Sequence, residues 1–391
     1  MPDVNQTAGP RLRAVHVSFY LDPEERSPNE LLAAWPTLVR TAAAAARAGA
    51  AVSVVQAAAE DQTVHREGVD VHFVRLTPPP GWRRRRVAAK LASPAPILRC
   101  LERLDPDVVL VSGLAFPLQV RALRKALPQT AVLVQDHADV PPSGWRSLLQ
   151  RRCFSGVAGV LFTAREQAEP FFHARVLEPT LPVFEVPEDS SNFVPGDQHE
   201  ARRSTGLEGD PCLLWLGRLD RNKDPLMLLE ALKSAAGRLR DPQLWCCYQD
   251  APLEQEVRQA TAADETLSKI VHFIGPRPHA EIETLCRAAD FLVQGSRREG
   301  SGYAVIEALA CGLTPLVTDI PSFRKLTGHG AVGALATPGD AEAFAKNLVE
   351  WSKLDRAQLR AAARRWFEQE LSYEVLGRRL HHACREVRRS R

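Results

Sequence analysis

Short apolar runs alternate with longer helical patterns along the first half of this chain. Between the first two runs, the stretch Ser27–Glu30 predicts a helix start with Ser27 as its cap, and Pro36 predicts a break in that helix. Repeated alternation of this kind is typical of a doubly wound, mainly parallel α/β sheet. Strands are predicted from the apolar runs at 14–19, 51–55, 108–111, 131–134, 160–162 and 182–186.

The alternation then restarts in the second half of the chain. Residues 187–210, between the two sets, are polar and irregular and therefore predict a domain boundary. A chain of 391 residues is also long for a single core. We therefore predict an N-terminal domain at 1–195, a C-terminal domain at 196–370 and a terminal helix at 371–391. The second set of predicted strands comprises 212–216, 244–248, 271–274, 289–294 and 314–318.

Composition narrows the class of protein. With 45% hydrophobic and 25% charged residues, the chain is globular, and a net charge of +3 is too small to indicate nucleic acid. No apolar run reaches the roughly 18–20 residues of a membrane span, and residues 1–6 show no signal peptide. The eight cysteines have neither Cys-x-x-Cys nor zinc spacing, so we expect reduced thiols in a cytoplasmic protein without a bound metal.

The most informative stretch is 296–312, where two carboxylates, Glu299 and Glu307, stand eight positions apart. A predicted strand precedes it, a loop with two glycines carries Glu299, and a helix carries Glu307. We expect Ser301 to cap this helix and Gly312 to end it. A strand, a glycine-containing loop and a helix N-terminus together predict an anion site, because the backbone N–H groups point outward and the helix dipole favours negative charge.

The spacing of the two carboxylates suggests what the anion carries. Glu307 would lie about 9 Å along the helix axis from the predicted cap, at about 1.5 Å per residue. That separation suits a carboxylate that binds the vicinal hydroxyls of a ribose while the helix start holds its phosphates. Glu299, on the loop, would then face the group attached beyond the phosphates. The pattern predicts a nucleotide-sugar site.

A second cluster of charge follows the strand predicted at 212–216. Arg218 and Lys223 lie five positions apart in the loop that begins at Gly217. Open α/β sheets bind ligands at the carboxyl ends of their strands. Arg218 can hold two phosphate oxygens at once, and Lys223 adds a mobile point charge.

The stretch 296–312 resembles the signature of family 4 of the retaining glycosyltransferases, in which two glutamates span a Glu-Gly-aromatic-Gly loop and the following helix. Here Ser301 stands where that family usually has Phe. The resemblance implies that Glu299 contacts the donor sugar and Glu307 binds the ribose, while backbone N–H groups bind phosphate. The residues expected to supply those N–H groups are Gly300, Ser301, Gly302 and Tyr303.

The same resemblance implies the GT-B fold: two Rossmann-like, doubly wound domains facing across a cleft, with a C-terminal helix that crosses back to the first domain. It also implies that Arg218 and Lys223 hold the donor diphosphate and stabilise it as it departs, so that no metal is needed. His137 follows the strand at 131–134, where family members often carry a histidine that approaches the donor sugar. We expect it to act as a hydrogen-bonding or weak acid–base group.

Other features leave alternatives open. Asp105-Pro106-Asp107 has the form of an Asp-x-Asp metal motif, but we interpret it as an ordinary strand entry. The loop 21–28 lacks the adjacent glycines of many family members, so the acceptor stays unidentified. A basic run is either a solvated helix surface or a contact with an anionic membrane that carries a lipid-linked acceptor. That run comprises Trp82, Arg83, Arg84, Arg85 and Arg86.

The function predicted from these features is transfer of a sugar from a nucleoside diphosphate to an acceptor hydroxyl, with retained anomeric configuration. The donor is a substrate, and no further cofactor is expected. Two rivals remain: a sugar-nucleotide epimerase with the same fold, and a non-catalytic nucleotide-binding or assembly protein. No Gly-x-Gly-x-x-Gly follows the first predicted strand, so a nicotinamide-dependent oxidoreductase is not supported.

Overall fold

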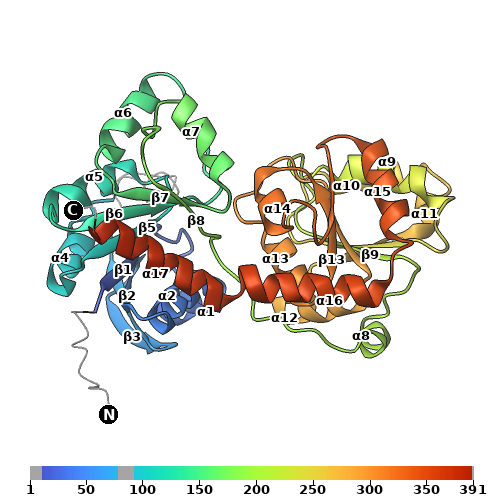
Figure 1. The fold of residues 1–391 in the computed structure, drawn as a ribbon, viewed down its shortest axis with the longest axis horizontal. Coiled ribbons are helices and arrows are strands. Elements are labelled where there is room, and N and C mark those ends of the chain that lie inside the picture. The colour runs from blue at the N-terminus through green and yellow to red at the C-terminus, as the bar shows by residue number, and fades with distance from the viewer. Residues whose placement is uncertain (1–10, 78–91, 390–391) are drawn as a thin grey trace, which may run out of the picture. The chain divides into compact units, whose positions relative to one another are not determined.

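The computed structural model describes residues 11–77 and 92–389. The chain divides into two compact units. Figure 1 shows them in colours that run from blue at the N-terminus to red at the C-terminus. The first unit combines Met1–Asp189 with Tyr373–Arg391, and the second is Ser190–Ser372. The boundaries expected from the sequence were 195 and 370. The basic run 82–86 lies outside the described residues.

The first unit is built on one sheet whose strands are parallel except at one edge. Every apolar run expected to be a strand in this half of the chain forms one. In spatial order the strands are β3 (Gln62–Arg66), β4 (Val69–Arg75), β2 (Ala51–Ala58), β1 (Arg13–Ser18), β5 (Val108–Ser112), β6 (Ala131–Gln135), β7 (Gly159–Phe162) and β8 (Val183–Glu185).

The hairpin formed by β3 and β4 was absent from the sequence expectations. Its turn is made by Glu67 and Gly68, which both have positive φ values, of 50° and 81°. Two consecutive left-handed residues match the right-handed twist of the strands that they join. The alternation of Val69, Val71 and Phe73 with Asp70 and His72 was the available signal, because these three apolar side chains are buried and the two polar side chains between them are not.

The second unit has a six-stranded sheet in which every pair of neighbouring strands is parallel. Its strands are, in spatial order, β11 (Val271–Gly275), β10 (Gln243–Cys247), β9 (Cys212–Leu216), β12 (Phe291–Gln294), β13 (Thr314–Thr318) and β14 (Ala334–Ala336). The short β14 was not expected from the sequence.

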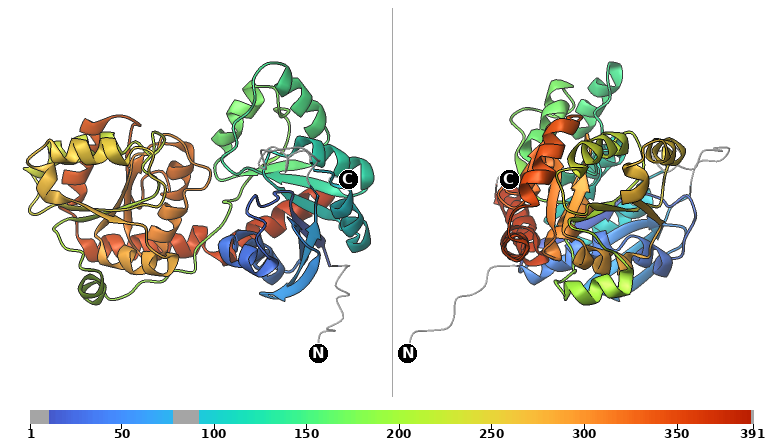
Figure 2. Two further views of the ribbon diagram at one scale, coloured as in Figure 1. Left: turned by 180° about the vertical axis from the view of Figure 1, so that it is seen from behind. Right: turned by 90° about the vertical axis from the view of Figure 1, so that its right-hand side faces the viewer.

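Helices cover both faces of the second sheet (Figure 2). Alternate residues of β9 point to opposite sides, so that Leu214 packs with one set of helices and Leu213 with the other. One set comprises α8 (Gln198–Thr205), α12 (His279–Ala288), α13 (Tyr303–Ala310), α14 (Pro321–Leu326) and α16 (Arg356–Trp366). The other comprises α9 (Pro225–Ala236), α10 (Glu254–Ala262), α11 (Leu267–Ile270) and α15 (Ala341–Trp351).

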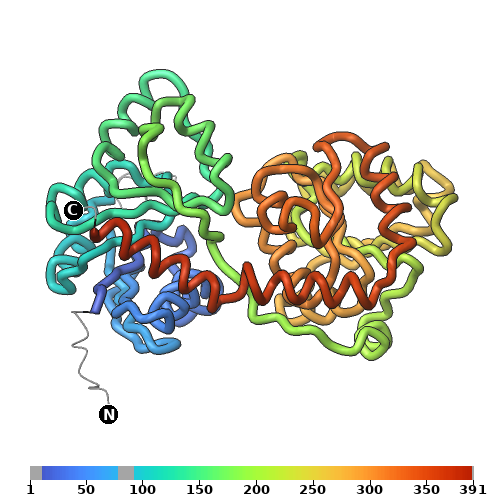
Figure 3. Tube along the Cα trace, viewed as in Figure 1, coloured from blue at the N-terminus to red at the C-terminus, as the bar shows by residue number. Residues whose placement is uncertain are grey.

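The C-terminal helix α17 (Tyr373–Arg389) belongs to the first unit, although it follows the whole second unit in sequence. It packs along α2 (Thr37–Arg47), as the trace in Figure 3 shows. The Tyr373 hydroxyl donates to the carboxylate of Asp189 at 2.7 Å, and Thr37 donates to the same carboxylate at 2.8 Å. This carboxylate therefore joins α17 and α2 to the end of the N-terminal segment.

The helix expected between the first two strands is broken where Pro36 predicted it. Helix α1 (Pro28–Ala34) ends before Pro36, and α2 begins directly after it. Ser27 caps α1, and Glu30 completes a capping box by accepting from the Ser27 backbone N–H at 2.8 Å. The cap and the break expected from the sequence are both confirmed.

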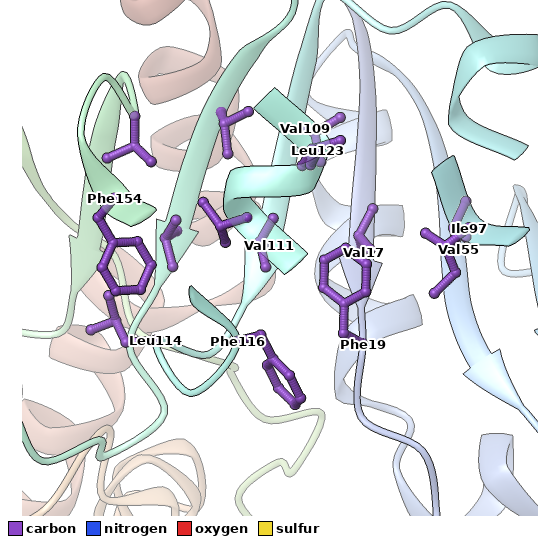
Figure 4. Packing of buried hydrophobic residues seen from close by; sticks show 14 of the residues in the cluster. Val17, Phe19, Val55, Ile97, Val109, Val111, Leu114, Phe116, Leu123 and Phe154 are labelled. Carbon is purple, nitrogen blue, oxygen red and sulfur yellow. The ribbon is translucent and has the colours of Figure 1, made fainter. Parts of the chain in front are cut away.

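Figure 4 shows the core on the face of the first sheet opposite to the one that α2 and α17 cover. There Val17, Val109 and Val111 point from the strands toward the side chains of Ile97 and Leu123. Each of these residues is almost completely buried. The covering elements are α4 (Ala95–Leu104), α5 (Pro117–Ala126), α6 (Trp145–Phe154), the 3-10 turn Arg165–Ala168 and α7 (Glu169–His173).

The contact between α17 and α2 gives a test of the packing of the first unit. A Cβ at Gly377 would lie 2.2 Å from the carbonyl oxygen of Ala44, so Gly377→Ala must push two helices apart. We expect the free energy of unfolding of this unit to fall by about 1–3 kcal/mol, as for other overpacked contacts. Calorimetry would measure the lowered transition temperature.

The matched control is Gly237→Ala, because no heavy atom lies within 4 Å of a Cβ at Gly237 and its φ is −68°. We expect this variant to be neutral or slightly stabilised. Equal transition temperatures for Gly377→Ala and the wild type would contradict the close approach of α17 to α2.

Candidate functional site

The two loops expected to carry the site follow neighbouring parallel strands. Residues 217–224 follow β9, and residues 295–302 follow β12. These strands are paired in parallel, so both loops leave the sheet at the same edge. Ligands bind at this edge in open α/β sheets.

Main-chain and side-chain contacts join the two loops directly. The backbone N–H of Arg297 donates to the carbonyl oxygen of Asn222 at 2.7 Å, and the Asn222 side-chain amide donates to the carbonyl of Arg298 at 2.9 Å. The Arg297 guanidinium also donates to one Asp224 oxygen, at 2.6 and 2.9 Å. These bonds fix the position of one loop against the other.

The contact most relevant to function is an ion pair between the two loops. The Nζ atom of Lys223 lies 2.5 Å from Oε1 of Glu299, and the two side chains are only 18% and 13% exposed. A pair this sheltered is screened little by salt, and removal of one partner leaves a poorly solvated charge. The sequence indicated each residue separately. The structure shows that each is the other's partner.

The second cation expected in the site, Arg218, forms ion pairs with two acidic side chains. Its guanidinium contacts Asp250 at 2.8 Å and Asp220 at 3.3 Å, yet more than half of its side chain is exposed. Gly217, just before it, has a φ of 143°, a conformation that other residues rarely adopt. A Cβ at Gly217 would lie 3.6 Å from Cε of Lys223. The glycine thus allows the chain to turn beside the lysine.

The helix that carries Glu307 begins later than expected. Helix α13 starts at Tyr303 and its N-cap is Gly302, with φ 66°, while no side chain caps it. The expectation that Ser301 caps the helix is therefore wrong. The chain turns left-handed at the cap, where glycine is favoured, and Ser301 is 2% exposed beneath the loop. A Cβ at Gly302 would also lie 2.7 Å from the ring of Phe323.

The structure also bears on the expected end of this helix and on the expected distance from its cap to Glu307. The helix ends as expected, with Cys311 at the C-cap and Gly312 at φ 75°. The distance from cap to Glu307 shortens, however, because the cap lies five rather than six positions before it. At about 1.5 Å per residue the axial separation is about 7.5 Å instead of 9 Å.

Glu307 has a partner that sequence reasoning missed. Its Oε1 atom lies 2.6 Å from Nε2 of His279, the first residue of α12, and the His279 ring packs against Phe193 at 5.0 Å between centroids. A signal was available: His279 follows the strand 271–275 at the same carboxyl edge as the other site residues. No local motif marks it.

A cavity of about 450 Å³ lies between these loops, within the second unit. Its volume falls in the range of small-molecule binding sites. Of the donor-site residues expected from the sequence, all line it except Gly300 and Ser301. Its lining comprises Leu216, Gly217, Arg218, Lys223, Cys247, Tyr248, Gln249, Asp250, Arg277, His279, Ile282, Gln294, Glu299, Gly302, Tyr303, Ala304 and Glu307.

The first turn of α13 borders this cavity through Tyr303 and Ala304. The first N–H groups of a helix have no partner within the helix, and the dipole gives this end partial positive charge. Together with Arg218 and Lys223, the turn makes one side of the cavity suitable for phosphate oxygens. The two glutamates provide acceptors for hydroxyl groups.

His137 belongs to the first unit, in the loop after β6. Its Nδ1 atom lies 2.9 Å from the Glu188 carboxylate. Burial lowers the pKa of His137, but the hydrogen bond and charge of Glu188, with smaller effects of Asp139 and Asp136, outweigh burial, so the pKa is raised. Burial, followed by repulsion from Asp139 and Glu188, raises the pKa of Asp136 to about 7. This loop therefore holds protons near neutral pH.

The Asp-Pro-Asp stretch has contacts typical of a strand entry. Asp105 ends α4 in a left-handed conformation, with φ 44°, and its carboxylate pairs with Arg13 at 2.9 Å. Asp107 accepts from the backbone N–H of the same Arg13 at 2.8 Å. Both carboxylates thus attach the start of β1 to the loop before β5.

Comparison with known proteins addresses the second unit most directly. Residues 197–366 match the family model described as Glycosyl transferases group 1. This part of the chain is therefore similar to the glycosyl transferases group 1 family. The matched region contains both loops, the cavity between them and helix α13.

Curated relatives match over part of their length. The chain is 28% identical over 254 residues to a GDP-mannose:cellobiosyl-diphosphopolyprenol alpha-mannosyltransferase of Xanthomonas campestris, covering 62% of this chain and 63% of the relative. It is 32% identical over 168 residues to a D-inositol 3-phosphate glycosyltransferase of Frankia alni, covering 41% of each chain. The matched regions are thus less than two thirds of these relatives.

Solved structures resemble the whole chain in fold. A sucrose-phosphate synthase from Thermosynechococcus elongatus has a TM-score of 0.71 at 18% identity, with 97% of this chain and 100% of the other covered. The Anabaena protein HepE in complex with UDP has a TM-score of 0.70 at 16% identity, with coverage of 96% and 100%. The expected GT-B fold, with two α/β domains built on mainly parallel sheets, is confirmed.

The raised pKa of Asp136 predicts a pH dependence of stability in the first unit. In the folded state this carboxyl keeps its proton up to about pH 7, whereas an unfolded aspartate loses it near pH 4. The folded state binds more protons between these values, so this group's contribution to the free energy of unfolding falls as the pH rises. Asp136→Asn cannot titrate and removes that contribution.

Relative to the wild type, Asp136→Asn should therefore become more stable, by about 2–4 kcal/mol, as the pH is raised from about 4 to about 7. Denaturant unfolding of both proteins at a series of pH values would measure the difference. Glu102→Gln, on the exposed side of α4, is the matched control. The difference in its free energy of unfolding from the wild type should stay constant over this pH range. A constant difference between Asp136→Asn and the wild type over this range would refute the assignment.

Proposed function

We propose that this protein is a retaining glycosyltransferase, which moves a sugar from a nucleoside diphosphate to an acceptor hydroxyl. The observation that carries the proposal is a single cavity that combines two cations, a helix N-terminus and two glutamates. This set matches the parts of a nucleotide-sugar: cations and N–H groups for the diphosphate, carboxylates for the hydroxyls on either side of it. The likeness to named glycosyltransferases supports the same reaction class.

The cations would stabilise the leaving group. As the bond between sugar and phosphate breaks, negative charge develops on the diphosphate. Arg218 and Lys223 would hold that charge, and preorganised charges of this kind stabilise a transition state more than solvent does. They would do the work that a metal ion performs in other transferases, so we infer a metal-independent reaction.

The backbone would complete the phosphate site. In this proposal the loop at Gly300, Ser301 and Gly302 and the first turn at Tyr303 offer N–H groups to the phosphate oxygens. The family usually has Phe where this chain has Ser301. This difference leaves the N–H groups in place, because they belong to the main chain. Ser301 itself is buried.

The glutamates would act at the two ends of the donor. Glu307 would bind the ribose hydroxyls, with His279 orienting its carboxylate through the 2.6 Å contact. Glu299 would contact the transferred sugar. Glu299 is engaged by Lys223. Donor binding would therefore exchange that ion pair for a contact between Lys223 and phosphate, which releases Glu299 toward the sugar.

In retaining transfer without a covalent intermediate, the acceptor oxygen attacks on the face that the diphosphate leaves, and a departing phosphate oxygen takes the acceptor proton. We propose this course for the present protein, with no protein nucleophile. His137 is proposed as a hydrogen-bonding or weak acid–base group toward the donor sugar, a role consistent with its raised pKa. The acceptor would be a hydroxyl of a glycan, a lipid-linked saccharide or a small molecule.

The first test is a thermal-shift screen with UDP, GDP, ADP and their sugar conjugates. A ligand at about 100 times its Kd adds about 2.7 kcal/mol of stability, which raises the transition temperature by a few degrees. We expect one nucleotide to do so. Arg218→Ala/Lys223→Ala should abolish the shift, because each lost charge-assisted bond costs about 1.5–3 kcal/mol. Arg203→Ala/Arg238→Ala, which removes two exposed cations elsewhere in the second unit, should keep it.

The nucleotide-sugar that binds is then offered to a panel of acceptors. Retention of the anomeric configuration in the product, read by NMR, and unchanged turnover in EDTA are expected. Consumption of donor without any acceptor would favour a sugar-nucleotide epimerase. Tight binding of a donor that no acceptor consumes would favour a non-catalytic module. Inversion at the anomeric carbon, or loss of turnover in EDTA, would contradict the proposed mechanism.

A further inference from the structure

The surface of the first unit has an unusual concentration of exposed apolar side chains. Val140, Trp145, Leu148 and Leu149 are all exposed, within ten consecutive residues. Among the described residues, no other stretch of that length holds more than one large exposed hydrophobic side chain. Scattered exposed hydrophobics are normal on protein surfaces, but a contiguous group is typical of an interaction surface.

Helical geometry places three of these side chains on one stripe. Trp145, Leu148 and Leu149 are separated by three and four positions in α6, so they lie next to one another on its surface, and Arg152 continues the stripe. Trp145 is 70% exposed and Leu148 is 55% exposed. The buried residues of the helix are Ser147, Cys153 and Phe154, and Phe154 packs in the hydrophobic core of the unit.

The charged side chains of α6 and of its neighbour α5 are all basic, while acidic groups outside these helices include Asp139, next to Val140, and Glu178. Helices α5 and α6 lie side by side (Figure 1) and contain no acidic residue. Their six basic residues are Arg121, Arg124, Lys125, Arg146, Arg151 and Arg152. Arg146 lies over the Trp145 ring at 5.7 Å, Arg151 pairs with Glu178 at 2.8 Å, and Arg124 donates to the carbonyl of Ser155. Leu118 adds one more exposed apolar side chain on α5.

We propose that this face, defined as the exposed side of α6 with Trp145, Leu148 and Leu149, docks on an anionic lipid surface. An interfacial helix combines an apolar stripe containing Trp and Leu with flanking basic residues, and the basic residues are attracted to anionic headgroups. The leucines distinguish this face from a nucleic-acid surface, on which aromatic and basic residues predominate. The proposal is independent of the reaction proposed above, since Trp145, Leu148 and Leu149 have no role in that reaction.

The test is co-flotation of the whole protein with vesicles at low salt. The vesicles contain either phosphatidylcholine alone or phosphatidylcholine with about one third phosphatidylglycerol. We expect flotation only with the anionic vesicles, and weaker flotation as salt is raised. Trp145→Ser/Leu148→Ser/Leu149→Ser should abolish it, and Arg146→Gln/Arg152→Gln should weaken binding roughly 25-fold, at about fivefold for each cation.

The matched controls replace exposed apolar and basic side chains of the second unit. Val194→Ser/Leu354→Ser removes two exposed apolar side chains of the second unit, and Arg203→Gln/Arg238→Gln removes two of its exposed cations. Both should float like the wild type. Transition temperatures equal to that of the wild type confirm that each variant is folded, as expected for exposed positions.

Three outcomes would overturn the proposal. One is no flotation of the wild type with anionic vesicles at low salt. A second is undiminished flotation of the triple variant, especially if replacing Arg83, Arg84, Arg85 and Arg86 by Gln alone abolishes binding. The third is a wild-type dimer that the triple variant converts to a monomer without any vesicle binding in either, which would assign the face to a second copy of the chain.

Discussion

The ion pair between Lys223 and Glu299 is the interaction on which the proposed donor site depends. It joins two loops that come from neighbouring strands, and the surrounding bonds from Asn222 and Arg297 hold those loops in register. The pairing of β9 with β12 brings the two loops to one edge of the sheet, and this junction holds their side chains against each other. In the proposed mechanism, a phosphate held by the first loop would lie against the start of α13.

The junction also contributes to the balance of charge within the site. Lys223 is balanced by Glu299, Arg218 by Asp220 and Asp250, and Glu307 contacts His279. In the proposed mechanism, a diphosphate that enters would compete with carboxylates for the cations, which would lower its affinity. It would also separate those carboxylates from their partners, and they would then become acceptors for the hydroxyls of ribose and sugar. The same exchange would couple recognition of the phosphates to recognition of the groups on either side.

Much of the fold could be predicted from sequence because its signals are local. Runs such as 108–111 and 131–134 are apolar at every position, as expected for strands covered on both faces, and Pro36 and Ser27 act on the backbone next to them. The hairpin 62–75 could have been found from its alternation and its Glu-Gly turn. The three-residue strand 334–336 could not, since its length is set by pairing with β13.

Some residues of the candidate site could also be picked out from the sequence, because their signals are local. The residue types and spacings of Arg218, Lys223, Glu299 and Glu307 are visible along the chain. Their partners are not, because Asp250 and His279 reach the site from other strand ends. The cap of α13 was misplaced by one residue: Ser301 is a good cap by side-chain chemistry, but the left-handed turn at Gly302 decides where the helix begins.

The most direct test of the Lys223–Glu299 exchange is the affinity of UDP, GDP and ADP, without a sugar, for Glu299→Gln and Lys223→Ala, measured by titration calorimetry. If Glu299 competes with the diphosphate for Lys223, loss of its charge should tighten binding of the nucleotide recognised by the wild type, by about 3–10-fold at the strength of a partly sheltered pair. Lys223→Ala should weaken the same binding. If Glu299→Gln instead weakens it as much as Lys223→Ala does, the carboxylate does not compete with the phosphates, and the exchange of partners at Lys223 does not occur.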